Sequence, residues 1–312
     1  MPFLPVGGQA VIEGVMMRSP TQVAVAVRRP DGAIAFLERR FTSITRRVKV
    51  LGWPILRGAV SLFETLYLGM TALNFSAEEA AAEEKAHDAE KPKAPWWQAA
   101  LQGVTLVFSL GIGLLLFVVL PARITGWLGA DGRIAFGLVD GLLRLTAFVL
   151  YLWLISQWKE MARVLGFHGA EHKAIHALEA DAPLTPESVQ TFTRFHPRCG
   201  TSFLFLVVMV SIVVFTFFGK PRGIGDHLLR IACMPLIAGV AFEFIRLSGK
   251  YSEKPLVKLL IWPGLQFQRL TTREPDLEMC AVAIAALEKV RNDEALVVTQ
   301  KQGGTTELQF VQ

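Results

Sequence analysis

The stretch AALQGVTLVFSLGIGLLLFVVL, which runs from Ala99 to Leu120, holds twenty-two residues without a charged side chain. A helix needs about 20 mostly apolar residues to cross the hydrocarbon core of a bilayer, so this stretch predicts a transmembrane helix. Trp96 and Trp97 lie just before it, and indole rings favour the interface between lipid and water. We therefore expect the chain to be anchored in a membrane.

Three further apolar stretches predict spans of the same kind. They are Leu138–Trp158, Thr201–Gly219 and Leu228–Leu247. The first contains Asp140 and Arg144, which are spaced i,i+4 on a helix and can neutralise each other. The last is the weakest of the four, because Arg230 lies near its start and Glu243 near its end.

Composition agrees with a chain that lies partly in lipid and partly in water. Of the 312 residues, 52% are hydrophobic and only 19% are charged, with a mean hydropathy of +0.40. A soluble globular chain has roughly 25% charged residues. These values exclude an ordinary soluble enzyme and a disordered chain, and they leave room for substantial segments outside the membrane.

The basic residues predict how the chain is oriented. Lysine and arginine number twelve in residues 1–98, five in 159–200 and nine after residue 245, against two in 121–137 and three in 219–230. By the positive-inside rule, both termini and the central segment face the cytoplasm, and two short loops lie outside. The expected location is the inner (cytoplasmic) membrane of the cell. The net charge of +5 then reflects topology, and we expect no nucleic-acid partner.

A small β unit is expected near the N-terminus. Gln22–Arg28 and Ala33–Glu38 are short β-rich runs, and the Pro-Asp-Gly sequence between them is typical of a turn. The run Ala10–Met17 is expected to add a third strand. Residues 54–75 are apolar but contain Arg57 and Glu64, which favours an amphipathic helix at the membrane surface. A fifth span is the alternative for this segment.

The predicted fold is a mainly α polytopic membrane protein, with about four transmembrane helices, interfacial helices and a small N-terminal β unit. The expected segments are a cytoplasmic β-rich unit (1–50), an interfacial helix with a charged linker (51–98), spans one and two (99–158), a cytoplasmic histidine-rich helix with an HPRCG turn (159–200), spans three and four (201–247), and cytoplasmic C-terminal helices with a loose tail (248–312).

The central segment contains the sequence FHGAEHK, residues 167–173, in a predicted helix. His168 and His172 are spaced i,i+4, so both imidazoles project from one helix face and can bind one metal ion. Glu171 can reach the same side. The pattern H-x-x-E-H is that of the inverzincins, in which two histidines bind zinc and the glutamate activates water. The alternative is a helix with surface histidines. His176, one turn further on, is expected to be exposed.

Residues 196–201, with the sequence HPRCGT, come just before the third span on the same side of the membrane. His196 and Cys199 are three residues apart and are candidate ligands of the same metal ion. The alternative for Cys199 is a small buried thiol. Arg198 is a candidate anion- or phosphate-binding residue. Glu243, at the cytoplasmic end of the fourth span, is a candidate third ligand, and an ion-paired glutamate is the alternative.

Four stretches together resemble the YqhQ-like family of bacterial membrane proteins. They are residues 7–18 (GGQAVIEGVMMR), 167–173 (FHGAEHK), 196–202 (HPRCGTS) and 263–275 (PGLQFQRLTTREP). The resemblance covers about residues 7–292. That family is described as a domain of unknown function and as a predicted metal-dependent enzyme, so it implies an integral membrane protein with a cytoplasmic His/Glu/Cys site. It also directs attention to Glu13, which is either a ligand or base in that site or an outward residue of an edge strand.

Two functions follow as expectations. The first is a membrane-embedded metal-dependent hydrolase with a divalent ion, zinc above all, and a lipid-linked or peptide substrate at the cytoplasmic face. In it Glu171 takes a proton from water, and Glu13 is a second catalytic candidate. The second is a non-enzymatic assembly factor or scaffold with a structural metal or cofactor site. Transport through Glu243, Asp140 and Arg144 ranks last, since no internal repeat is evident.

Overall fold

The computed structural model describes residues 6–81, 96–130, 132–251 and 254–302. The strands are β1 (Gly7–Val11), β2 (Gly14–Arg18), β3 (Gln22–Arg28) and β4 (Ile34–Arg40). The helices are α1 (Ile44–Arg47), η1 (Lys49–Gly52), α2 (Leu56–Ala80), α4 (Trp96–Leu114), η2 (Leu115–Val119), α5 (Leu120–Trp127), α6 (Arg133–Ile155), α7 (Lys159–Glu179), α8 (Pro186–Gln190), α9 (Gly200–Phe218), α10 (Ile224–Lys250), α11 (Pro255–Thr271) and α12 (Leu277–Gln302). The predicted linker at 82–95 lies outside the described residues, as does the end of the predicted tail.

Within the described residues, four helical stretches are long and apolar enough to cross a membrane. They are Val107–Trp127, Arg133–Ile155, Gly200–Phe218 and Ile224–Ser248. The chain is thus a mainly helical protein with four candidate spans and a small N-terminal sheet, as predicted. The first span continues beyond the predicted end at Leu120. A wide π-helical turn, η2, comes just before Pro121, whose missing N–H interrupts the helical ladder without ending the helix.

Helix α2 is not among the four candidate spans. Its buried side packs against the sheet and against α10, and Glu64 on this side pairs with Arg18 of β2 at 3.2 Å. At the crossing with α10, a Cβ on Gly239 would lie 2.3 Å from the carbonyl oxygen of Ile55, so only glycine permits this approach. The other side of α2 exposes Phe63, Leu66, Tyr67 and Met70. This amphipathic pattern agrees with the predicted helix at the membrane surface.

The sheet has the order β1-β2-β3-β4, and all neighbouring strands are antiparallel. The prediction of a single strand over residues 10–17 was wrong, because a tight turn divides this run into β1 and β2. Glu13 occupies that turn with φ of 53°, in the left-handed region. The following residue must be glycine, since a Cβ on Gly14 would lie 2.2 Å from the carbonyl oxygen of Ala26.

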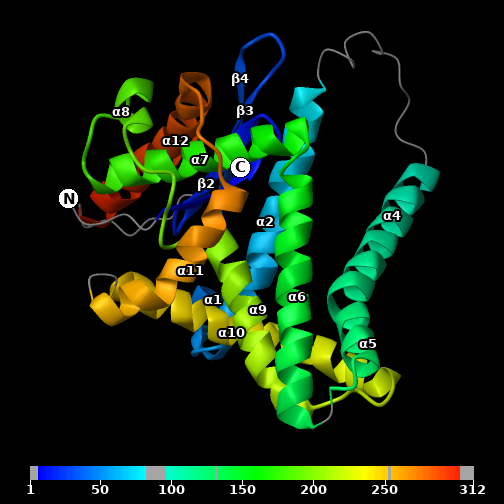
Figure 1. The fold of residues 1–312 in the computed structure, drawn as a ribbon. Coiled ribbons are helices and arrows are strands. Elements are labelled where there is room, and N and C mark those ends of the chain that lie inside the picture. Colours follow the sequence, from blue (N-terminus) through cyan, green and yellow to red (C-terminus); the bar gives the residue numbers. More distant parts are fainter. Residues whose placement is uncertain (1–5, 82–95, 131, 252–253, 303–312) are drawn as a thin grey trace.

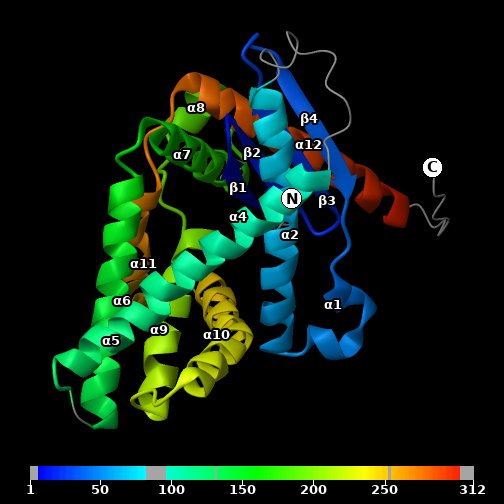
Figure 2. The same ribbon diagram turned by 90° about the vertical axis from the view of Figure 1, so that its right-hand side faces the viewer.

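Both faces of the sheet are covered by helices, as Figures 1 and 2 show. Val23, Val25 and Val27 of β3 face α2, whereas Ala24 and Ala26 between them face α7 and α12. Successive residues of a strand point to opposite faces of the sheet. Because both faces are covered, the valines and the alanines of the run QVAVAVR are all buried, which explains its continuous apolar stretch. The sheet, α7 and α12 pack together at one end of α6 and α9. The N-terminal sheet, the histidine helix and the C-terminal helix therefore lie at the same end of the candidate spans.

Candidate metal centre

Helix α7 presents His168, His172 and His176 on one face, because residues four apart in a helix lie above one another. The opposite face is apolar: Phe167, Ala170, Ala174 and Ala177 belong to the core shared with β2, β3 and α12. Packing of that core fixes the rotation of α7. The histidines are thereby turned toward the segment that leads into α9.

Two backbone carbonyls orient the first two histidines. Nδ1 of His168 donates to the Thr271 carbonyl oxygen at 2.7 Å, and Nδ1 of His172 donates to the Arg194 carbonyl oxygen at 2.5 Å. With the proton on Nδ1, the neutral ring keeps its lone pair on Nε2. Histidines that bind metals are commonly held in this way by a hydrogen bond from the other ring nitrogen.

Gly169 allows the loop after α11 to reach His168. A Cβ on Gly169 would lie 2.1 Å from the carbonyl oxygen of Arg273, and the Arg273 N–H donates to the Leu165 carbonyl oxygen at 2.8 Å. This close approach positions the Thr271 carbonyl against the imidazole. The glycine between His168 and Glu171 in the FHGAEHK sequence is therefore required by the contact that orients a candidate ligand.

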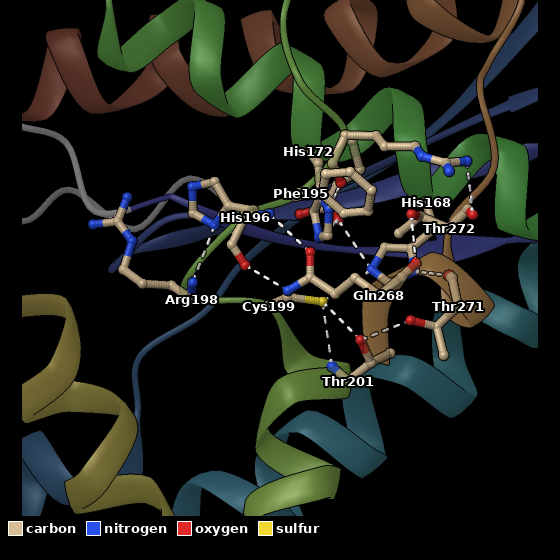
Figure 3. A network of polar contacts seen from close by, with 12 residues as sticks. His168, His172, Phe195, His196, Arg198, Cys199, Thr201, Gln268, Thr271 and Thr272 are labelled. Atoms are coloured by element: carbon tan, nitrogen blue, oxygen red, sulfur yellow. Dashed lines mark hydrogen bonds and ion pairs between the residues drawn. The ribbon is translucent and has the colours of Figure 1, made fainter. Parts of the chain in front are cut away.

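Cys199 completes a group of three possible ligands. Its Sγ lies 3.2 Å from Nε2 of His168, and it accepts a hydrogen bond from the Thr201 N–H at 3.3 Å, at the N-terminus of α9. One ligand atom from each of His168, His172 and Cys199 lies within 4.8 Å of the others (Figure 3). Tetrahedral zinc, with bonds of about 2.0–2.3 Å, places ligand atoms about 3.3–3.7 Å apart. Small side-chain movements would therefore bring all three atoms onto one ion.

The electrostatics of this group favour a cation. Burial raises the pKa of Cys199, but the charges of His168 and His172 outweigh burial and hold it well below its usual value. Burial lowers the pKa of His172, but Glu171 and Cys199 outweigh this effect and raise it to about 9. Without a metal ion, these shifts favour a proton on the His172 imidazole and a thiolate at Cys199. A divalent cation competes with that proton for the same position.

Glu171 lies beside the histidine pair. Its Oε2 is 3.6 Å from Nε2 of His172 and 3.8 Å from Nε2 of His168, and the residue is buried. Strand β1 covers it, because Gly8 lies so close that a Cβ there would be 2.5 Å from Cγ of Glu171. The N-terminal strand therefore closes one side of the candidate centre, a role that the sequence reading did not foresee.

His196 is not brought into the group with Cys199, contrary to the prediction. Gln268 of α11 holds its backbone on both sides: the His196 N–H donates to Oε1 at 2.8 Å, and Nε2 of Gln268 donates to the His196 carbonyl oxygen at 2.7 Å. The ring then points toward Glu179, with Nε2 3.4 Å from Oε1. Burial, together with the charge of His172, lowers the pKa of His196 to about 4.

A second possible ligand group consists of His176, Glu179 and His196, whose ligand atoms also lie within 4.8 Å of one another. The prediction that His176 is exposed was wrong, since its Nε2 donates to the Phe195 carbonyl oxygen at 2.9 Å and the ring is half-buried. The repeated spacing of four residues from His168 to His176 was the signal for its placement. Nothing in the sequence reading pointed to Glu179.

Three predicted site residues are engaged elsewhere. Glu243 accepts from Nε of Arg57 at 2.6 Å, so the ion-paired alternative holds and the predicted third ligand does not join the group. Glu13, in the β1–β2 turn, accepts from Nη2 of Arg163 at 2.6 Å. Arg198 pairs with Glu179, a carboxylate of the same chain. In each case a complementary charge nearby satisfies the side chain.

Comparison of the sequence with known proteins identifies the family to which the chain belongs. Residues 53–293 match the family described as "Protein of unknown function (DUF1385)". The chain is also 33% identical over 302 residues to "Uncharacterized protein YqhQ" of Bacillus subtilis (strain 168), a similarity that covers 93% of each chain. No solved structure matches. The candidate centre lies in motifs that the resemblance had singled out, and the protein belongs to this YqhQ-like family.

Proposed function

We propose that this protein is a membrane-embedded metal-dependent hydrolase. His168, His172 and Cys199 hold a divalent cation, zinc most readily, and Glu171 acts as the general base. The observation that carries the proposal is the convergence of these three ligand atoms within 4.8 Å, with a buried carboxylate oxygen 3.6–3.8 Å from both histidine nitrogens.

The donor set fits zinc. Two imidazole nitrogens and a thiolate are ligands that zinc accepts, and sites with three protein ligands leave a fourth position for water or substrate. Nε2 of His172 is buried and has no hydrogen-bond partner among the described residues. An unsatisfied buried nitrogen of this kind costs free energy, and a metal ion at this point would remove the cost.

The chain's own residues supply the other parts of a hydrolytic site. A divalent ion supplies Lewis acidity and lowers the pKa of water toward about 7. Glu171 is placed to accept the proton of an attacking water, and the carbonyls of Thr271 and Arg194 keep both imidazoles in position. Strand β1 at Gly8 shields the carboxylate from bulk solvent.

The position of the centre supports a substrate class and a location. Cys199 comes directly before Gly200, the first residue of a candidate span, so the centre lies at the end of that span. A lipid-linked molecule or a membrane-proximal peptide can reach such a place. The distribution of lysine and arginine supports the cytoplasmic face of the bacterial inner membrane, with both termini in the cytoplasm.

A second candidate function is a non-enzymatic membrane assembly factor, or a scaffold, with a structural metal site. Burial of Cys199 and His172 favours it, since their relative exposures are only 4% and 1%. Thiolate ligands are also common in structural zinc sites. In this case the ion would tie α7 to the start of α9, and Glu171 would serve only as a charge partner of the histidines.

Metal content and turnover in matched variants test the proposal. We expect the full chain, purified in detergent without chelator, to contain about one zinc ion, and His172→Ala and Cys199→Ser to lose it. Glu171→Gln should keep the ion but lose hydrolysis of p-nitrophenyl esters or quenched-fluorescence peptides in mixed micelles. His227→Ala, outside both ligand groups, is the control and should match wild type.

Three results would count against the proposal in distinguishable ways. Wild-type protein that contains no more metal than His172→Ala would refute the metal centre itself. A metal-loaded Glu171→Gln protein that hydrolyses the same probes as fast as wild type would refute the role of Glu171. A metal-loaded wild type that hydrolyses none of the probes, and unfolds at lower temperature after metal removal, would favour the structural site.

A further inference from the structure

An open cavity of about 530 Å³ lies beside the candidate centre, between the C-terminal turn of α6 and the end of α11. We call it the arginine cavity, because Arg194, Arg269 and Arg273 line it. Trp153 and Ser156 contribute to the wall from α6. It is separate from the proposed ion position. His168 and His172 point their Nδ1 atoms toward Thr271 and Arg194 on the cavity side, and their Nε2 atoms toward Glu171.

The cavity carries an excess of positive charge. Glu274 is the acidic residue in its lining, and its Oε2 pairs with Nζ of Lys173 at 2.8 Å, while Oε1 is 3.6 Å from Nε of Arg194. Lys173 thus largely neutralises Glu274, which leaves the three arginines in excess. Arg269 is exposed and has no ion-pair partner among the described residues.

Two of the guanidinium groups are held in place by backbone carbonyls. Arg273 donates through Nη2 to the Ser156 carbonyl oxygen at 2.5 Å, and Arg194 donates through Nη1 to the Thr272 carbonyl oxygen at 3.1 Å. Each guanidinium has five N–H donors, so one contact to a carbonyl leaves several donors for a ligand. Fixed guanidinium groups of this kind suit the oxygens of a phosphate group.

The cavity also lies at the end of a candidate membrane span. Trp153, in the last turn of the α6 span, is 48% exposed, and Ser156 comes directly after the span ends at Ile155. On α11, which forms the other wall, Leu256, Leu259, Leu260 and Trp262 are exposed. Tryptophan at a helix end and an exposed apolar face on a neighbouring helix are features of the membrane interface, where phospholipid phosphates lie.

We propose that the arginine cavity binds the phosphate group of an anionic glycerophospholipid, with its acyl chains beside the exposed face of α11. Free phosphate offers the same oxygens. A lipid is favoured because Trp153 and Leu270 give the cavity an apolar wall that inorganic phosphate cannot use. This site is independent of the proposed hydrolase function, since it needs no metal ion and no turnover.

The experiment measures binding of soluble short-chain lipids to the full chain in detergent. We expect dihexanoyl-phosphatidylglycerol to bind at least about tenfold more tightly than dihexanoyl-phosphatidylcholine or inorganic phosphate, measured by isothermal titration calorimetry. Arg269→Gln should weaken phosphatidylglycerol binding roughly tenfold, because it removes a charged donor from an otherwise intact cavity. Arg269 makes no ion pair among the described residues, so this variant should fold normally. The double variant Arg269→Gln/Arg273→Gln should weaken binding further.

The matched control is Arg39→Gln/Arg40→Gln, which removes two exposed positive charges from β4, outside the cavity. It should bind phosphatidylglycerol as wild type does. Equal weakening in this control would mean that overall charge attracts the lipid, and would overturn the proposal. Inorganic phosphate that binds as tightly as phosphatidylglycerol would overturn the choice of a lipid. Unchanged phosphatidylglycerol binding in Arg269→Gln and in the double variant would refute the arginine cavity as the binding site.

Discussion

Gly8 lies against Glu171, and this contact gives the most local prediction. A Cβ at this position would lie 2.5 Å from Cγ of Glu171 and 2.7 Å from Oε1, in a place where the glutamate is buried. Because the carboxylate cannot move into solvent without leaving the histidines, we expect Gly8→Ala to lower the free energy of unfolding by about 1–3 kcal/mol. Denaturant titration in detergent measures this change.

The neighbouring glycine supplies the control. A Cβ on Gly7 meets nothing within 4 Å, so Gly7→Ala should change the free energy of unfolding by no more than about 0.5 kcal/mol. If the metal centre forms as proposed, Gly8→Ala should also bind zinc more weakly than Gly7→Ala. Equal stability of the two variants would show that β1 does not press on Glu171.

At the level of single residues, periodicity predicted the candidate ligands better than sequence proximity did. His168 and His172 are on one helix, where a spacing of four fixes their relative direction. His196 and Cys199 are only three residues apart, but they lie in a turn around Pro197, where spacing does not fix direction. The buried amide of Gln268, 72 residues further along the chain, decides where His196 points. No local pattern contains that information.

At the level of elements, a polar network within the candidate spans joins α6 to its neighbours. Asp140 of α6 accepts from Nε of Arg144 at 2.9 Å, as the i,i+4 spacing predicted, and lies 3.7 Å from Nη1 of Arg230 on α10. Arg144 also donates to the Val118 carbonyl oxygen at 3.3 Å, in the wide turn η2. All three charged residues are buried, so one carboxylate balances two guanidinium groups.

Removal of that carboxylate should be costly. We expect Asp140→Asn to lower the free energy of unfolding by about 3–5 kcal/mol, because both arginines would remain buried without a counter-charge. Asp226→Asn, at the exposed start of α10, removes the same charge and should cost no more than about 1 kcal/mol. Unfolding of purified protein by a graded series of sodium dodecyl sulfate measures both. A loss in Asp140→Asn no larger than in Asp226→Asn would contradict the proposed balance.

Elements dominated by hydrophobicity were predicted well, and those that depend on tertiary contacts were not. Long apolar stretches, two of them without any charge, predicted all four candidate spans, because a helix in lipid must be apolar over about 20 residues whatever its neighbours are. The β1–β2 turn was missed, since its tight fit depends on a carbonyl of β3 against Gly14. The two-sided burial of β3 was also missed, because the helices that cover it come from residues 56–80, 159–179 and 277–302.

At the scale of the whole molecule, the fold shows which segments lie at the same end of the candidate spans. The sheet, α7 and α12 form one body at one end of the candidate spans, and the ends of α5 and α9, at residues 127 and 218, lie at the other end (Figure 1). If the chain crosses the membrane four times, the segments before the first crossing and after the last lie on the same side. The sequence had predicted the same grouping from charge alone, because translocation disfavours segments rich in lysine and arginine.

Which end faces the cytoplasm can be tested with two single cysteines. Arg39 on β4 and Arg222 between α9 and α10 are both exposed and lie at opposite ends of the spans. The native cysteines Cys199 and Cys280 are buried and Cys233 is partly buried, so they should give little background. The sheet belongs to residues 1–98, which hold twelve basic residues, so by the positive-inside rule a membrane-impermeant maleimide should label Arg222→Cys in intact spheroplasts. It should label Arg39→Cys only after permeabilisation. The reverse pattern would place the candidate metal centre and the arginine cavity at the outer face, and would exclude a cytoplasmic substrate.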